Sequence, residues 1–376
     1  MKFVCVSCFD YYNVRTREIL EYFESKNFQV EYIIPDFNHF SQEKSKIQFK
    51  NTRLIHVPAY YKNISLNRIY SHYKFSKGVY DELIKFQPDI IYCMLPPNFL
   101  TREIIKYKNK FKCRVIFDVY DLWPESMPVL NNKIFKIPFN LWRNLRDKYI
   151  NKADLIICVS KFTEEFLKNI HADLNTKILY PSIYDEDKNN FEIPERKFNI
   201  DNPENEITFC HLGNINHIVD TELALKILCG LAKYKRVKIN LIGSGLGLKK
   251  FVDDLEKNNI QVIQHGVIFD MAEKIKIYNS SDLGLCVPKV IINSAMPLKA
   301  AEYIKCGLPF VNNSLGDMRE IVENFKIGIN CNVLDDVTNK ILKLTREDLI
   351  NMSRNCKLVY KKYFMHDFDE LFKNFL

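Results

Sequence analysis

The sequence predicts an α/β protein of two domains, each built on a parallel sheet with helices on both faces. Short apolar segments alternate with amphipathic helical patterns, the alternation stops once in a polar stretch, and it then resumes. Strands that are covered on both faces consist of nearly continuous apolar residues, which is typical of parallel sheets. A chain of 376 residues is long enough for two domains of ordinary size.

The first domain is expected over residues 1–180. Its expected strands are Phe3–Ser7, Gln29–Ile34, Ile90–Leu95, Val115–Asp118, Leu155–Ser160 and Lys177–Tyr180. Residues 181–206 are polar and charged and contain three prolines, so they are expected to form a surface linker.

The second domain is expected over residues 207–359. Its expected strands are Ile207–Leu212, Lys238–Ile242, Gln261–His265, Leu283–Val287 and Pro309–Asn312. The end of the chain, residues 360–376, is an amphipathic segment that can pack back on the first domain. Ligands of open parallel sheets bind at the carboxyl ends of the strands, so we expect two such domains to face each other across a cleft.

Composition places the chain among globular proteins, with 47% apolar and 27% charged residues. No apolar run reaches the roughly 18 residues that suggest a membrane span, and the first residues do not read as a signal peptide, so we expect a cytoplasmic location. The 11 cysteines are scattered through apolar segments, which is typical of core residues in a reducing compartment. Cys5 and Cys8 form a CxxC without a second pair, which favours core packing over a zinc or redox role.

The net positive charge of the chain is concentrated in its first half. Residues 1–180 contain 28 Lys and Arg against 19 Asp and Glu, a net charge of +9, whereas the remainder has a net charge of −1. This asymmetry predicts an anionic partner for the first domain.

Residues 131–152 combine basic side chains with an aromatic stripe, and residues 66–86 do so less clearly. Each segment is either a helix that lies on an anionic membrane surface or an ordinary helix whose stripe is core. The sequence carries no nucleic-acid-binding signature.

No P-loop, HExxH, paired CxxC or EF-hand motif is present, so neither a metal site nor a nucleotide triphosphatase site is expected. Gly243, Gly245 and Gly247 follow a predicted strand, but Leu248 stands where a dinucleotide fingerprint needs glycine. This turn either lets a ligand approach the backbone or is a plain tight turn.

A lysine stands in the first turn of a predicted helix in "NSAMPLKAAEYIKCGLPF". Pro297 is expected at the first helical position, and Gly307 and Pro309 end the helix. Lys299 then lies near the positive end of the helix macrodipole, where a cation is unfavourable and an anion is favoured. Either the side chain points into water or it faces an anionic ligand.

A second informative stretch is "FDVYDLWPES", which follows a predicted strand. It places the carboxylates Asp118, Asp121 and Glu125 around Tyr120 and Trp123. The stiff Trp123–Pro124 dipeptide is either a wall for a sugar or another ring, or part of a helix cap with a buried tryptophan.

Seven stretches in order resemble the family 4 glycosyltransferases of GT-B fold, above all those that build bacterial capsules and surface polysaccharides and share the "DLWPES" loop. They are "DLWPES", "ICVSKFTEEFL", "HLGNIN", "LIGSG", "VIQHGVIFDMAEKIKIYNSSDLGLCVP", "PLKAAEYIKCGLPFV" and "GDMREIVENFKIGI". The resemblance implies two Rossmann-like domains and a retaining, metal-independent hexosyl transfer from a UDP- or GDP-sugar. No cofactor is implied beyond this substrate. The implied acceptor is a lipid-linked glycan or a polysaccharide at the inner face of the cell membrane.

The resemblance also implies the roles of particular residues. Lys299 and Asp121 are the implied catalytic residues, and Glu302 matches the glutamate that binds the ribose hydroxyls of the donor. The implied donor-binding residues are Gly213, Asn214, Gly243, Gly245, Gly266, Ser294, Ala295, Met296, Pro297, Leu298 and Glu302. The implied acceptor-binding residues are Asp10, Tyr12, Arg15, Tyr120, Trp123 and Glu125.

The chain departs from the family pattern at four places. Ser294 stands where the first of two glutamates is expected, and "HLGNINHIVD" lacks the usual Arg and Lys for the diphosphate. "FDYYNVR" replaces a glycine-rich turn, and Tyr120 replaces a His or Arg. Lys299 is therefore expected to be the main cation for the leaving group. A nucleotide-sugar epimerase or hydrolase, and a non-catalytic partner subunit, are the alternative interpretations.

Overall fold

The structure is a computed structural model that describes residues 1–9, 12–39, 41–45, 49–62, 65–126, 136–181, 183, 198, 205–289, 296–331 and 334–376. The chain divides into two compact units. Unit 1 comprises Met1–Ser182 and His366–Leu376, and unit 2 comprises Ile183–Met365.

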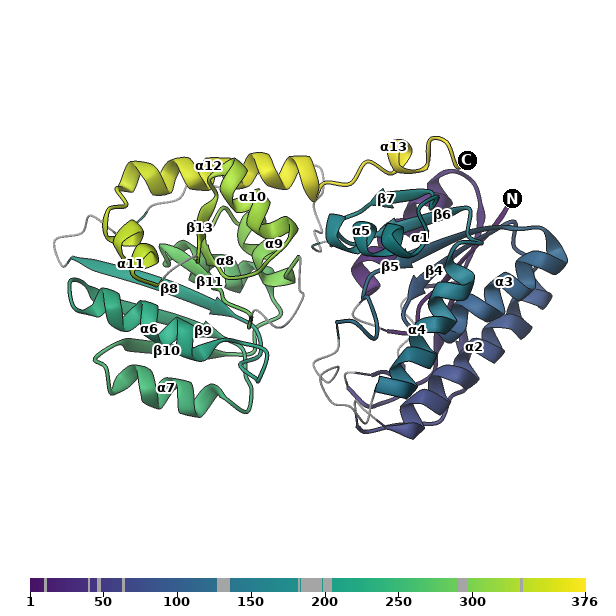
Figure 1. Cartoon of the computed structure of the whole chain (residues 1–376), viewed down its shortest axis with the longest axis horizontal. Coiled ribbons are helices and arrows are strands. Elements are labelled where there is room, and N and C mark those ends of the chain that lie inside the picture. Colours follow the sequence, from purple (N-terminus) through teal and green to yellow (C-terminus); the bar gives the residue numbers. More distant parts are fainter. Residues whose placement is uncertain are drawn as a thin grey trace. The chain divides into compact units, whose positions relative to one another are not determined.

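Unit 1 is built on a seven-stranded sheet with the order β3-β2-β1-β4-β5-β6-β7, in which every neighbouring pair is parallel. The strands are β1 (Lys2–Val6), β2 (Gln29–Pro35), β3 (Thr52–Ile55), β4 (Ile90–Leu95), β5 (Arg114–Val119), β6 (Leu155–Cys158) and β7 (Thr176–Ile178). The helices are α1 (Asn13–Ser25), α2 (Leu66–Phe86), α3 (Phe99–Phe111), α4 (Lys136–Ile150), α5 (Lys161–Ile170) and α13 (Phe368–Phe372). Helices α2, α3 and α4 lie side by side along the sheet (Figure 1).

Unit 2 is built on a six-stranded parallel sheet with the order β10-β9-β8-β11-β12-β13. The strands are β8 (Glu206–Leu212), β9 (Arg236–Ile242), β10 (Gln261–Gly266), β11 (Leu283–Cys286), β12 (Phe310–Asn312) and β13 (Gly328–Asn330). The helices are α6 (Thr221–Ala232), α7 (Leu248–Glu256), α8 (Met271–Asn279), α9 (Leu298–Lys305), α10 (Asp317–Phe325), α11 (Leu334–Leu342) and α12 (Arg346–Tyr363).

The predicted fold class of two parallel α/β units is confirmed. All eleven expected strands are present, to within two residues at each end. Two strands were not predicted, β3 and β13, which lie at the sheet edges. Both are short, and β3 exposes Arg53 and Leu54 to solvent, so neither carries the continuous apolar pattern of a buried strand.

The C-terminal segment packs on unit 1 through aromatic rings. The ring of Phe372 in α13 lies 5.5 Å from that of Tyr22 and 5.3 Å from that of Phe23, both in α1. Asp369 accepts a hydrogen bond from the Tyr22 hydroxyl at 2.9 Å and pairs with Lys26 at 2.7 Å. Helix α1 therefore holds the end of the chain against the first sheet.

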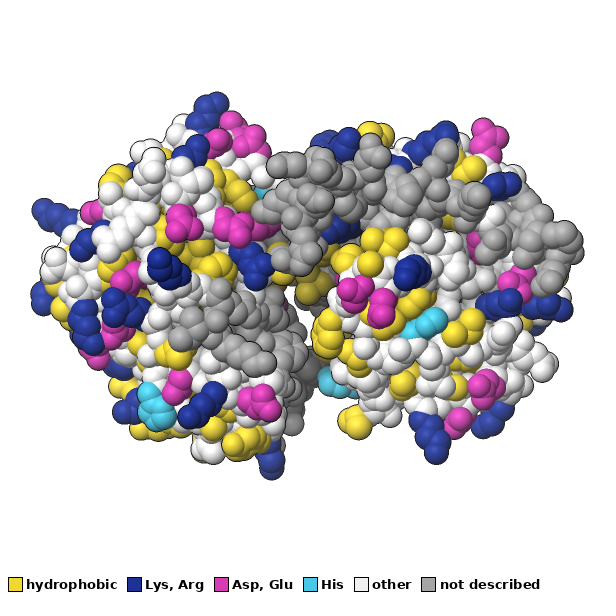
Figure 2. Space-filling model, turned by 180° about the vertical axis from the view of Figure 1, so that it is seen from behind, with side chains coloured by type: hydrophobic (Ala, Val, Ile, Leu, Met, Phe, Trp, Pro, Cys, Tyr) yellow, Lys and Arg dark blue, Asp and Glu magenta, His cyan; other side chains and the backbone are white. Residues whose placement is uncertain are grey.

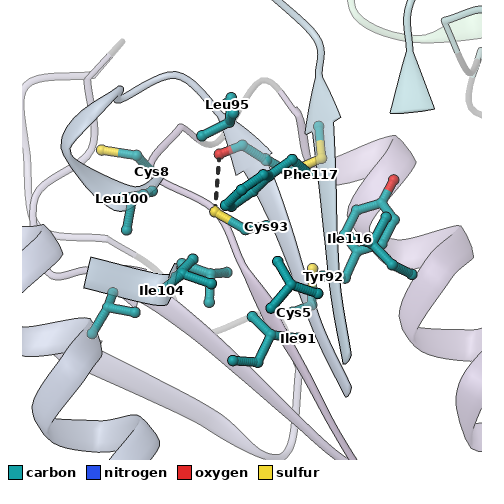
Figure 3. Close-up of a cluster of buried hydrophobic side chains, with 14 of the residues drawn as sticks. Cys5, Cys8, Ile91, Tyr92, Cys93, Leu95, Leu100, Ile104, Ile116 and Phe117 are labelled. Carbon is teal, nitrogen blue, oxygen red and sulfur yellow. Dashed lines mark hydrogen bonds between the residues drawn. The ribbon is translucent and has the colours of Figure 1, made fainter. Parts of the chain in front are cut away.

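The cysteines of the CxxC segment lie in the core of unit 1. Figure 3 shows Cys5, Cys8 and Cys93 among apolar side chains such as Leu100 and Ile104. Burial raises the pKa of the Cys8 thiol above its usual range, although Arg68 lowers it in part. Neutral, buried thiols are inert core residues, and all 11 cysteines are free.

Backbone contacts tie three strand ends of unit 2 together. Gly213 N donates to Ile242 O at 2.8 Å, and Gly243 N donates to Gly266 O at 2.7 Å. Gly243 has φ +142°, and a Cβ added to it would lie 2.2 Å from Gly213 O. Gly245 has φ +134°, and a Cβ there would lie 2.2 Å from Ile215 O. The loops after β8 and β9 therefore pack backbone on backbone, which only glycine allows.

We expect Gly243→Ala to lower the free energy of unfolding of unit 2 by about 2–4 kcal/mol, because it adds a steric clash to an unfavourable backbone conformation. Gly266→Ala is the matched control, since Gly266 has φ +71° but open space around its Cβ position. It should cost about 1 kcal/mol. Urea denaturation of both variants measures the difference, and equal costs would contradict the close contact between the two loops.

Candidate active site

The candidate site lies at the carboxyl ends of β8 and β11 in unit 2. These two neighbouring strands mark the point where the strand order reverses, because the chain runs from β8 outward to β10 and then returns to β11. Ligands of open α/β sheets bind at such a switch point. Helix α9 follows β11 and begins at this edge of the sheet.

Lys299 lies in the first turn of α9, close to the end of β8. A Cβ added to Gly213 would lie 3.7 Å from Lys299 Nζ, so the ammonium stands beside this glycine. Burial lowers the pKa of Lys299, whereas the nearby Cys286 and Cys210 raise it. Within the described part of the chain, no carboxylate pairs with this ammonium.

The start of α9 differs from the expectation by one residue. Pro297 is the N-cap, with φ −66° and ψ 128°, and Leu298 is the first helical residue. No side chain caps this end of the helix. Lys299 therefore lies even nearer the positive end of the macrodipole than predicted, which adds to the excess of positive potential.

His211 in β8 is a buried neighbour of this cation. Burial, and then the charge of Lys299, lower the pKa of its imidazole well below the usual range. A neutral imidazole offers Lys299 no negative charge. Nε2 of His211 has no hydrogen-bond partner among the described residues. Sequence reasoning did not single out this residue, because its proximity to Lys299 depends on strand pairing.

Glu302 lies one turn after Lys299 and is held by two side chains of α8. Lys274 Nζ lies 2.8 Å from Glu302 Oε1, and the Tyr278 hydroxyl donates to the same oxygen at 2.5 Å. Lys274 and Tyr278 were not predicted as site residues. The local sequence gives no signal for them, since β11 and the loop after it separate α8 from α9.

The other residues predicted to bind the donor are distributed around this edge. Gly213, Gly243 and Gly266 stand at the ends of β8, β9 and β10, and Asn214 Oδ1 packs against Gly245. Met296 is buried and Leu298 is exposed. Ser294 and Ala295 lie outside the described residues.

In unit 1, a group of predicted acceptor residues lies at the ends of β1 and β5. The Tyr12 hydroxyl donates to Asp121 Oδ2 at 2.8 Å, and the rings of Tyr12 and Tyr120 lie 4.6 Å apart. The Arg15 guanidinium lies 5.2 Å from the centre of the Tyr120 ring. Tyr12, Arg15, Tyr120 and Asp121 therefore form one cluster, while Asp10 lies outside the described residues.

Both terminal nitrogens of Arg15 are bound by the protein. Arg15 forms a buried ion pair with Asp118 at 3.0 Å and donates to the carbonyl oxygens of Leu179 and Tyr180 at 2.7 and 2.6 Å. The Tyr92 hydroxyl donates to the same carboxylate oxygen. Arg15 thus holds α1 to the chain that leaves β7. This contact is structural. In the same cluster Tyr12 is buried, and Asp121 is partly exposed.

Trp123 and Glu125 of the "DLWPES" loop are also used internally. Trp123 is buried, with Arg68 4.6 Å from its ring centre and the ring of Trp142 5.6 Å away. Glu125 pairs with Arg143 at 2.6 Å and with Arg146 at 2.8 Å. Ion pairs and an aromatic contact therefore hold the loop against α4, in agreement with the interpretation of Trp123 as a buried residue.

The aromatic stripe of residues 131–152 is core where it is described. Phe139 and Trp142 of α4 are buried, and Arg146 is buried in its ion pairs. The part of this stripe that the structure describes cannot be a membrane-facing surface. Helix α4 instead exposes Ile137 and Leu141.

A cavity of about 200 Å³ opens at the carboxyl ends of β1 and β2 in unit 1. Its lining includes Cys8, Phe9, Asn13, Tyr32, Phe37 and Lys44. It combines apolar walls with amide, hydroxyl and ammonium groups, which are the groups that bind hydroxyl-rich ligands.

Among the described residues, no group of three or more His, Cys, Asp or Glu side chains could hold a metal ion. The helices that the structure describes in both units include none with the length and apolar character of a membrane span.

Two family models match separate parts of the chain. The model described as Glycosyltransferase Family 4 matches residues 13–183, and the model described as Glucosyltransferase 3-like, C-terminal domain, matches residues 291–367. Among curated proteins, none matches the chain in sequence.

Solved structures share the fold over nearly their whole lengths. Sucrose-phosphate synthase from Thermosynechococcus elongatus is 13% identical with a TM-score of 0.74, and 100% of this chain and 98% of that chain are covered. Anabaena Alr3699/HepE in complex with UDP and glucose is 13% identical with a TM-score of 0.64 and coverages of 100% and 98%. The lipopolysaccharide outer core galactosyltransferase WaaB is 15% identical with a TM-score of 0.66, and both chains are covered to 100%.

At these identities the structural likeness establishes the fold. The family models add a similarity of residues 13–183 to glycosyltransferase family 4 and of residues 291–367 to the glucosyltransferase 3-like C-terminal domain. Together, the matches support a GT-B glycosyltransferase.

Proposed function

We propose that the protein is a retaining, metal-independent glycosyltransferase that moves a hexose from a UDP- or GDP-sugar to a lipid-linked glycan or polysaccharide of a bacterial surface. One observation carries this proposal. Lys299 stands at the start of α9 and at the switch point of the second sheet, without a carboxylate partner in the described part of the chain. The match to glycosyltransferase models and the UDP complex of a structural neighbour support it.

The donor diphosphate is proposed to bind between Lys299 and the glycine loops. The first N–H groups of a helix have no intrahelical acceptor, so the start of α9 offers donors as well as the positive end of its dipole. Gly213 brings the backbone close to Lys299 Nζ, and Gly243 allows the loop after β9 to pack against Gly213. Glu302 lies one turn further along α9, within reach of the ribose.

Catalysis is proposed to be electrostatic. The bond between the anomeric carbon and the phosphate oxygen breaks, and the acceptor oxygen bonds to that carbon on the same face of the sugar. The nucleoside diphosphate leaves with a developing charge that Lys299 and the helix terminus stabilise. The acceptor proton is transferred to the departing phosphate.

The acceptor is proposed to bind at unit 1, where the Tyr12 hydroxyl fixes the Asp121 carboxylate at 2.8 Å. A carboxylate oriented in this way can align an acceptor hydroxyl. The cavity beside β1 and β2 lies on the same edge of that sheet and offers space for a sugar of the acceptor.

A membrane surface is proposed as a further partner of unit 1. Leu66 and Tyr70 at the start of α2 and Ile137 and Leu141 at the start of α4 are exposed, and we name these four residues the apolar patch. The rings of His72 in α2 and Trp142 in α4 lie 6.3 Å apart, so the two helices approach each other at this point. On the face shown in Figure 2, Lys and Arg side chains are scattered among other residues. The excess of basic residues in the first half of the chain favours anionic lipid.

We expect Lys299→Ala to lower kcat by about 10²- to 10³-fold, the equivalent of about 2.7–4 kcal/mol, because the variant lacks the charge that stabilises the leaving group. Lys250→Ala is the control, since Lys250 is exposed on α7. Release of nucleotide from a panel of UDP- and GDP-sugars, with and without a membrane extract as acceptor source, measures the effect. Wild-type turnover in Lys299→Ala would contradict the role of this residue.

The same assay separates the alternatives. Consumption of donor without any acceptor would identify an epimerase or a hydrolase. Failure of UDP, GDP and their sugars to raise the melting temperature of the wild type would identify a non-catalytic partner subunit.

Binding of UDP or GDP should weaken at high pH. Burial lowers the pKa of Lys299 in the free protein, so the ammonium loses its proton below the usual value of about 10.4. Above that lowered pKa, Kd should rise with pH, and binding should be accompanied by proton uptake. Calorimetric titrations across this range test the prediction. Lys299→Arg should remove the dependence because a guanidinium stays charged, and an unchanged dependence in that variant would contradict the assignment.

Binding to anionic vesicles should depend on the apolar patch. We expect the double variant Ile137→Ser and Leu141→Ser to weaken binding to phosphatidylglycerol vesicles by about 10-fold or more, because two apolar side chains no longer enter the interface. Leu358→Ser is the control, since Leu358 is exposed on α12 of unit 2. Co-sedimentation with anionic and neutral vesicles measures the binding of the wild type and of both variants. Equal binding by the double variant and the control would contradict the membrane contact.

A further inference from the structure

The carboxylate of Glu302 is held from one side by a pair of donors on α8. Lys274 and Tyr278 are four residues apart, so they stand one above the other on one face of that helix. Both reach Glu302 Oε1, at 2.8 Å and 2.5 Å. The side chains of Lys274 and Glu302 are 10% and 13% exposed, and Tyr278 is fully buried.

The two donors leave the other carboxylate oxygen unused. Among the described residues, none donates a hydrogen bond to Glu302 Oε2, and this atom is not a buried, unsatisfied one. Oε2 therefore keeps its lone pairs and some access to solvent. A carboxylate oxygen with two free lone pairs can accept from two adjacent hydroxyl groups.

The support behind this carboxylate is rigid. The ring of Tyr278 packs edge-on against that of Tyr303 at 5.8 Å and 90°. The Tyr303 hydroxyl accepts from Leu212 N at 2.9 Å and donates to Cys210 O at 3.2 Å. Helices α8 and α9 are thus tied to β8, the strand whose end stands beside Lys299.

The tyrosine remains a donor at any physiological pH. Burial, and then the charge of Glu302, raise the pKa of Tyr278. Its hydroxyl therefore stays protonated and directs its hydrogen at Oε1. A free glutamate side chain loses rotamer entropy when a ligand fixes it, whereas Glu302 is already held in place before a ligand binds.

We propose that Lys274 and Tyr278 are positioning residues that hold Glu302 so that Oε2 accepts hydrogen bonds from the vicinal hydroxyl groups of the donor ribose. This inference rests on the proposed function, in which a nucleotide occupies this edge of unit 2. It adds a structural basis for discrimination between nucleotides by their 2′-hydroxyl group. The protein should prefer ribonucleotides to 2′-deoxyribonucleotides, and the preference should depend on two residues that do not touch the sugar.

The test compares the affinities of UDP and GDP with those of their 2′-deoxy counterparts. We expect Tyr278→Phe and Lys274→Met each to raise Kd for the ribonucleotide by about 3- to 10-fold, the worth of one hydrogen bond. Kd for the deoxy counterpart should change little, so the ratio of the two affinities falls. Lys276→Met is the matched control, because Lys276 is exposed on the same helix.

If Lys274 and Tyr278 had only a structural role, their substitution would raise Kd for the ribonucleotide and for its 2′-deoxy counterpart by the same factor. That result would overturn the proposal. Tyr278→Phe preserves the ring and its packing, so it addresses the hydrogen bond even if Lys274→Met lowers stability. In a Glu302→Gln background, Tyr278→Phe should no longer change the ratio. If the ratio stays at the wild-type value in Tyr278→Phe while the wild type binds UDP or GDP, the inference fails and the proposed function stands. If the wild type binds neither nucleotide, both fail.

Discussion

A partly buried cation without a carboxylate partner among the described residues is the constraint on which the second unit depends. The Lys299 ammonium stands beside Gly213, at the positive end of a helix, and the neighbouring His211 is held neutral by burial and by that same ammonium. No described carboxylate neutralises it. Such an arrangement is unfavourable in the empty protein and becomes favourable when an anion enters. The unneutralised cation lowers the stability of the free protein, and binding of a diphosphate removes this penalty.

The surrounding elements make that place accessible and rigid. Glycines at the ends of β8 and β9 let the loops pack backbone on backbone, so main-chain groups lie close to the Lys299 ammonium. Tyr303 ties α9 to β8, and Lys274 and Tyr278 hold Glu302 one turn after Lys299. A cation and a carboxylate on one helical face are thus fixed at a spacing that suits two parts of one nucleotide.

Patterns within one segment were predictable from the sequence, whereas pairings between distant segments were not. Continuous apolar runs identified every buried strand, and Pro297 and Gly307 marked the limits of α9 to within a residue. The edge strand β3 was missed because its side chains are largely exposed. The partners of Glu302 and the proximity of His211 to Lys299 depend on how α8, α9 and β8 meet. The aromatic stripe with Phe139 and Trp142 has the spacing of both a core and a membrane face, and only packing distinguishes the two.

A crystal structure of the protein with UDP or GDP bound tests most directly whether Lys299 receives the diphosphate. We expect diphosphate oxygens within hydrogen-bond distance of Lys299 Nζ and of the first N–H groups of α9, with the ribose on Glu302 Oε2. Phosphates bound elsewhere, with Lys299 facing solvent or a side chain of the protein, would contradict this expectation.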